Sequence, residues 1–207
     1  MSNYRLNIRF TGDDLDTIYA CRQRVIIVKH TAEQQHKVAW VSFNPFEINT
    51  VDWETRFSLY ASTSEVQGGA KISKLSTHDG QTQLNTIFDR GYFSATEPDD
   101  SINSSSYKVT NRNSDEKMLT FGLAQSVSVN GTAYMDNPVN AILVPRGQSA
   151  VMTPIERIDV FLEANIDSST VLTRIDSRSL ALTYGEGAKE FSLSYDSVNG
   201  VFFQASK

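Results

Sequence analysis

The chain has little cysteine, proline and glycine, and it has no long apolar run. Its 207 residues include one cysteine, five prolines and eleven glycines. A single cysteine excludes an internal disulfide framework, and the modest proline and glycine content argues against disordered and fibrous classes. No apolar run approaches the ~20 residues that a membrane-spanning helix needs. We therefore expect a soluble globular chain without a transmembrane segment.

An excess of positive charge is also missing. The formal net charge is −5, with both signs interspersed along the chain. Proteins that grip nucleic acid need a basic face, so we expect no nucleic-acid partner. The first residues lack the apolar core of a signal peptide. The sequence thus predicts a cytoplasmic protein, and it leaves open release by a route that needs no signal peptide.

What is present is an internal similarity between the two halves. When the sequence is shifted by 101 positions, residues 13–62 lie over residues 114–163 without a gap. Apolar positions match in kind, including Val41 with Ile142, Phe43 with Val144, Phe57 with Ile158 and Leu59 with Val160. This pattern predicts an internal tandem duplication. The alternative is one large β-domain whose hairpins only look alike.

Alternation of apolar and polar residues with a period of two dominates the chain and is typical of β-strands. One short helix is expected at 11–19, where Thr11 and Asp14 have the spacing of a capping box, and 114–121 is a candidate second copy. The pair Asn130-Gly131 predicts a tight hairpin. Strands are expected at 4–10, 24–30, 38–44, 56–62, 70–75, 84–88, 91–95, 107–111, 125–130, 139–145, 157–163, 171–176, 180–184, 190–195 and 201–205.

The stretch 96–106 has almost nothing to bury and is typical of a solvated connection. It falls where a duplication needs its join. We therefore predict an all-β protein of antiparallel β-sandwich units, with residues 1–103 as the first repeat and 104–207 as the second. The two repeats are expected to pack with pseudo-twofold symmetry.

No catalytic, metal or cofactor site is predicted from the spacing of reactive residues. The three histidines are scattered through polar segments and lack metal-ligand spacing (His30, His36 and His78). The acidic residues Asp13, Asp14 and Asp16 fit the start of a helix, where the helix dipole favours negative charge, better than a calcium site. Cys21 is expected to be a small buried hydrophobe.

Aromatic side chains give the strongest functional signal, because both tryptophans lie within a short stretch of the first repeat. Three rings face small residues or proline in the second repeat: Trp40 faces Ala141, Phe46 faces Gly147 and Trp53 faces Pro154. These rings are not needed to build the core of the second repeat. We therefore predict that they contact a ligand or partner. The alternative is that they fill the seam between the repeats.

The sequence predicts a non-catalytic binding or assembly protein, which is lectin-like, toxin-like or self-associating. The corresponding partners are carbohydrate, a lipid surface or a second copy of the chain. The alternative is an enzyme with a dispersed carboxylate site, such as a glycosidase. Its candidate carboxylates are Glu47, Asp52, Glu54 and Glu156, and retaining chemistry would need two of them ~5 Å apart.

Overall fold

The computed structural model describes residues 3–33 and 36–205. Eighteen strands and one helix make up this part of the chain. In chain order they are β1 (Asn3–Arg9), α1 (Gly12–Ala20), β2 (Gln23–Thr31), β3 (His36–Phe43), β4 (Ile48–Glu54), β5 (Ser58–Ser62), β6 (Lys74–Asp79), β7 (Leu84–Asp89), β8 (Tyr92–Pro98), β9 (Tyr107–Asn111), β10 (Met118–Val129), β11 (Thr132–Pro138), β12 (Asn140–Pro145), β13 (Ser149–Met152), β14 (Pro154–Ala164), β15 (Val171–Leu172), β16 (Leu180–Thr183), β17 (Glu190–Asp196) and β18 (Val201–Gln204).

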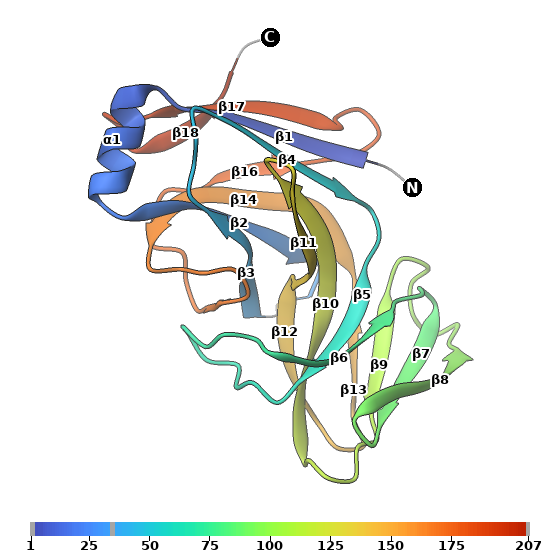
Figure 1. Cartoon of the computed structure of the whole chain (residues 1–207). Coiled ribbons are helices and arrows are strands. Elements are labelled where there is room, and N and C mark those ends of the chain that lie inside the picture. The colour runs from blue at the N-terminus through green and yellow to red at the C-terminus, as the bar shows by residue number, and fades with distance from the viewer. Residues whose placement is uncertain (1–2, 34–35, 206–207) are drawn as a thin grey trace.

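The strands form one large sheet and one small sheet (Figure 1). The large sheet has 14 strands, and its main path runs β16-β14-β2-β3-β12-β10-β4-β1-β17-β18. The small sheet has the order β13-β9-β7-β8 and lies at the opposite end of the molecule from β1, β17 and β18. The all-β prediction is therefore confirmed.

Two strand pairs depart from the predicted antiparallel pairing. Strand β1 runs parallel to β17, and β7 runs parallel to β9. A parallel pair needs a long crossover connection rather than a hairpin, and pairing between strands far apart in the chain supplies it. Local alternation of apolar residues carries no information on strand direction, so the sequence pattern missed both pairs.

Helix α1 begins as its sequence predicts. The Thr11 hydroxyl accepts a hydrogen bond from the Asp14 amide at 3.2 Å, and the Asp14 carboxylate accepts one from the Thr11 amide at 2.8 Å. The prediction of a second helix at 114–121 is wrong, because β10 begins at Met118. Residues 118–121 pair with β12, and this ladder outweighs the weak helical preference of one polar turn.

Strands from the two halves of the chain alternate in the large sheet. Strand β2 pairs with β14, β5 with β10 and β1 with β17, so each of these first-half strands has a neighbour from the second half. Residues 1–103 and 104–207 therefore do not form separate sheets. The two repeats predicted with these bounds stay a prediction as copies of one ancestral unit.

Pairing patterns recur between the two halves. Strand β1 pairs with β4 antiparallel and with β17 parallel, and β9 pairs with β13 antiparallel and with β7 parallel. In the first antiparallel pair Ile8 lies opposite Asn49, and in the second Val109 lies opposite Ala150. Both residues of the second pair follow their counterparts by 101 positions, the same shift that aligns the sequence.

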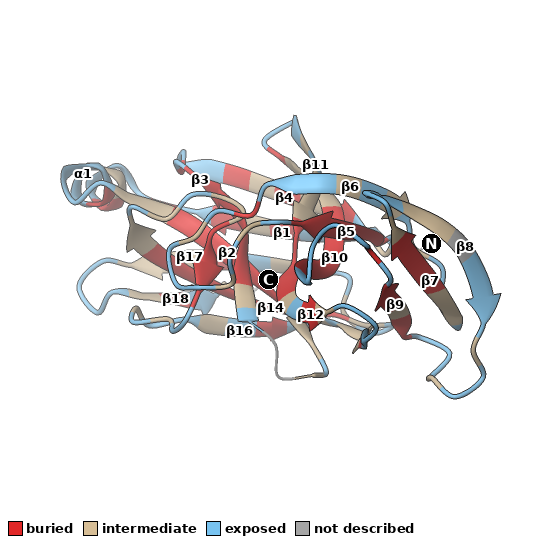
Figure 2. Ribbon diagram, turned by 90° about the horizontal axis from the view of Figure 1, so that it is seen from below, coloured by how far each residue is buried: buried red, intermediate tan, exposed pale blue. Residues whose placement is uncertain are grey.

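The core is formed by buried side chains of the large sheet, and it continues to buried side chains of the small sheet (Figure 2). The matched apolar positions predicted as core are inside: Val41, Phe43, Val144, Phe57, Ile158, Leu59 and Val160 are buried, and Ile142 is partly buried against them. The Asn130-Gly131 hairpin joins β10 to β11, with φ of 51° and 82°. Both angles are positive, as a tight hairpin turn of this kind requires.

Candidate functional site

The three predicted contact residues lie in different environments. Trp40 on β3 is fully buried, and Trp53 on β4 is 4% exposed. Phe46, in the loop between these strands, is 60% exposed. The two indole rings meet edge to face, with centroids 5.5 Å apart. Trp40 therefore has no free surface for a partner, whereas Phe46 does.

The indoles surround a buried ammonium group. Nζ of Lys29, on β2, lies 4.9 Å from the ring centroid of Trp40, 5.3 Å from that of Trp53 and 5.2 Å from that of Phe57. An ammonium over an aromatic face is attracted by the quadrupole of the ring, and the attraction grows when water is excluded. Trp40, Trp53 and Phe57 thus line an aromatic cage, called the Lys29 cage below, and the side chain of Lys29 occupies it.

Hydrogen bonds complete this cage. Nζ of Lys29 donates to Oε1 of Gln125 at 2.6 Å and to Oε2 of Glu156 at 3.0 Å. The Trp40 indole N–H donates to the Gln125 carbonyl at 2.9 Å. Burial lowers the pKa of Lys29 to about 8, although the charge of Glu156 and its hydrogen bond act in the opposite direction. The first half of the chain, through Lys29, thus contacts the second half at Gln125 and Glu156.

An irregularity in β14 brings Glu156 to this point. His30 lies opposite Ile155 and Lys29 lies opposite Ile158, so Glu156 and Arg157 have no partner of their own on β2. Such bulges bend a strand and redirect its side chains. The sequence signal that was missed is Lys29 itself, a lysine that directly follows the buried run from Val25 to Val28.

The carboxylates proposed for the enzyme alternative are not gathered into one site. Oδ1 of Asp52 lies 2.7 Å from Nε of Arg5 on the outer face of β1 and β4, and Glu156 forms an ion pair with Lys29. Glu47 is exposed on the loop before β4. Glu54 and Asp52 border an open depression near Trp53. The enzyme alternative stays a prediction.

Phe46 is held rigidly although it is exposed. Its amide donates to Oδ1 of Asn49 at 2.8 Å, and its carbonyl accepts from Nδ2 of the same side chain at 2.6 Å. Asn49 is fully buried. The Tyr19 hydroxyl donates to the Pro45 carbonyl and ties the loop to α1. These bonds fix the backbone that carries the Phe46 ring.

One prediction about a reactive residue needs correction, and one contact of a histidine was not foreseen. Cys21, at the C-cap of α1, is exposed rather than buried, because the inward face of α1 consists of Asp14, Leu15 and Ile18. His30 is not isolated, since its Nε2 lies 2.8 Å from Oδ2 of Asp159. The geometry of this contact is not that of an aligned hydrogen bond. Sequence spacing missed it because the two residues are on different strands.

Metal-binding clusters of three or more histidine, cysteine or carboxylate residues are absent from residues 3–33 and 36–205. Over the same residues, no helix has the length and apolar character required to cross a bilayer. Comparison of the chain with protein-family models, with curated proteins and with solved structures finds no match.

Proposed function

We propose that the chain is a non-catalytic binding protein that associates with a second copy of itself. The contact surface is the Phe46 patch, defined as the side chains of Tyr19, Phe46 and Ile48. These side chains are 46%, 60% and 67% exposed, and they surround one loop. The observation that carries the proposal is a large exposed ring on a backbone fixed by hydrogen bonds to the buried side chain of Asn49.

A fixed aromatic anchor favours association. A side chain whose backbone is already ordered loses less conformational entropy when a partner covers it. Aromatic residues that fill a pocket in the partner also supply much of the binding energy at protein interfaces. The Phe46 ring meets both conditions on the free protein.

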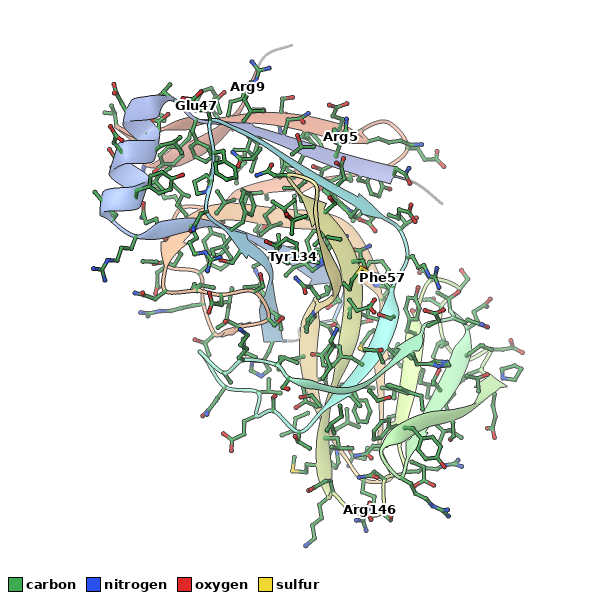
Figure 3. The ribbon with its side chains drawn as sticks, viewed as in Figure 1. Arg5, Arg9, Glu47, Phe57, Tyr134 and Arg146 are labelled. Carbon is green, nitrogen blue, oxygen red and sulfur yellow. The ribbon has the colours of Figure 1, made fainter. Side chains whose placement is uncertain are left out.

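The charges beside the patch favour a second copy as the partner. Glu47 lies between Phe46 and Ile48 in the chain, and Arg9 lies opposite Ile48 in the pairing of β1 with β4. Figure 3 places Arg9 and Glu47 at the same end of the molecule. Within the described residues neither is in an ion pair. In a twofold contact each surface meets itself, so Arg9 of one copy can pair with Glu47 of the other.

The recurring strand pairs support the predicted tandem duplication with pseudo-twofold packing. On this proposal two ancestral chains of about 100 residues exchanged strands and were later fused. Phe46 faces Gly147 in the repeat alignment, and Tyr19 belongs to a helix that has no counterpart among residues 104–205. The Phe46 patch is therefore a feature of one half only, and it is free to serve a contact outside the chain.

Sedimentation velocity over a range of protein concentrations tests the association. The wild-type chain is expected to shift toward a dimer as its concentration rises. Phe46→Asp should abolish the shift, because a carboxylate cannot enter an apolar contact without a partner. Met135→Asp is the matched control: Met135 is 68% exposed on β11, away from the patch.

A charge exchange makes the test specific. Arg9→Glu and Glu47→Arg should each weaken dimerisation, and the double variant should restore it, because the pair is re-formed with reversed charges. A chain that stays monomeric at all concentrations contradicts the proposal. Binding of the monomer to liposomes or to a glycan panel, lost with Phe46→Asp, would assign the patch to a lipid surface or to carbohydrate instead.

A further inference from the structure

A cationic cavity lies on the face of the large sheet opposite the Lys29 cage. The segment from Ile166 to Ile175 covers this face, and a second apolar cluster forms beneath it from Ile26, Val28, Ala39, Phe161 and Leu172. At the edge of the cluster is a cavity of about 390 Å³. This volume is within the range of small-molecule sites.

Hydrogen-bond donors dominate the wall of this cavity. Its lining includes His36, Lys37 and Arg174 as basic groups and the hydroxyl groups of Thr173 and Ser179. Leu172 and Ile175 form an apolar portion of the wall. A second, adjoining cavity shares His36 and Lys37 and adds His30 and the carboxylate of Glu33.

The one carboxylate in the lining lies close to basic side chains. Asp159 is buried, with Oδ2 lying 2.8 Å from Nε2 of His30 and 3.4 Å from Nζ of Lys37. Nε of Arg157 lies 3.9 Å from Oδ1. Lys37 and Arg157 thus place two positive charges beside one acid, so Asp159 does not cancel the positive charge around the cavity. Asp176, which is not in the lining, places its Oδ1 2.7 Å from Nε of Arg174.

We propose that this cavity binds a small molecule through an oxyanion, of the phosphate or sulfate type. Lys37 and Arg174 supply charge-assisted hydrogen bonds, and Thr173 and Ser179 supply neutral donors. Lys37 is held in place from two sides, because β3 pairs there with both β12 and β15. Asp159 positions the Lys37 side chain. The site lies apart from the Phe46 patch and does not depend on self-association.

Isothermal titration calorimetry with inorganic phosphate, at constant ionic strength maintained with chloride, tests the site. The wild-type chain is expected to bind one phosphate. Lys37→Gln and Arg174→Gln should each weaken binding about tenfold, as expected for the loss of one charge-assisted hydrogen bond. The matched control is Arg90→Gln, which removes a positive charge from the turn after β7 in the small sheet.

A second variant separates occupancy of the cavity from general electrostatics. Ser179→Trp fills the cavity and removes no charge, so it should abolish binding while retaining the β-strand signal in far-ultraviolet circular dichroism. Absence of phosphate binding to the wild-type chain would overturn the proposal. Equal weakening by Arg90→Gln, or full binding to Ser179→Trp, would also overturn it, because the anion would then be responding to net charge alone.

Discussion

The ammonium of Lys29 lies 3.0 Å from the carboxylate of Glu156, and the lysine side chain is completely buried. Removing one partner of a buried pair leaves the other without compensation, at a cost of about 3 kcal/mol. Lys29→Met should therefore lower the free energy of unfolding by about that amount. Urea denaturation measures it. Arg56→Gln breaks an exposed pair with Asp79 and should cost less than about 1 kcal/mol. Equal losses of unfolding free energy in the two variants would show that the Lys29 cage does not stabilise the fold.

The same lysine makes stability depend on pH. Its pKa is lowered from 10.5 to about 8 by burial, so between these values the unfolded chain binds more protons than the folded one. Stability should then rise as the pH increases from about 8 toward 10, by an amount on the order of 3 kcal/mol for complete titration. Burial raises the pKa of Tyr60 and Tyr184, which reverses the trend above pH ~10. In Lys29→Met the rise should be much smaller, and an unchanged rise would contradict this assignment.

Both tryptophans should report a dry environment. Trp40 is fully buried and Trp53 is nearly so, and these are the only two tryptophans in the chain. We expect blue-shifted emission and little quenching by iodide, which cannot enter a packed core. Partial unfolding in denaturant should red-shift the emission and permit quenching. Efficient quenching of the native chain would indicate that one indole is at the surface.

The cap of α1 should contribute measurably to stability. Thr11→Ala removes the acceptor for the Asp14 amide and should cost about 1 kcal/mol, whereas Thr11→Ser keeps the hydroxyl and should cost much less. Burial raises the pKa of Asp14, but hydrogen bonds from Thr11 outweigh this and lower it. The contribution of the carboxylate is therefore present above pH ~4 and is lost as the pH falls through the folded-state pKa. Thermal unfolding at pH 7 and pH 3 checks both effects.

Neither half of the chain should fold alone as a monomer. A fragment of residues 1–103 loses the neighbours of β1, β2 and β5, which are β17, β14 and β10. The exposed strand edges would remain unpaired or would pair with another copy. We expect poor dispersion in the amide region of its proton NMR spectrum, and recovery when residues 104–207 are added. A well-dispersed monomeric fragment would contradict the interleaved architecture.

Local sequence patterns predicted the class of the fold and many of its elements. The capping box of α1 and the Asn130-Gly131 turn are determined by neighbouring residues, and both were found as expected. Strands β4, β11 and β13 were missed. Polar residues interrupt the apolar pattern of β4, β11 ends in Asp136, Asn137 and Pro138, and β13 is only four residues long. Pairing with partner strands rather than propensity holds these strands in place.

The candidate sites were harder to predict, since they depend on contacts across the chain. Phe46 was identified because its counterpart in the repeat alignment is a glycine. For Trp40 the sequence left open contact with a partner and burial in the seam between the repeats. Its burial depends on a cage that Gln125 and Glu156 complete from the other half. The contact of His30 with Asp159 likewise depends on the pairing of β2 with β14. The spacing of residues along the sequence predicts neither arrangement, because both join residues on different strands.

The parallel pairing of β1 with β17 has a consequence for biosynthesis. Asn7 donates a hydrogen bond to Glu190, a residue 183 positions later in the chain. Strand β1 therefore lacks one of its two neighbouring strands until nearly all of these residues have been synthesised and have left the ribosome. Long-range closure of this kind is slow, and the waiting edge is open to aggregation. Slow translation should accordingly give little benefit, and a chaperone that shields the nascent N-terminal strand should improve the yield of folded protein.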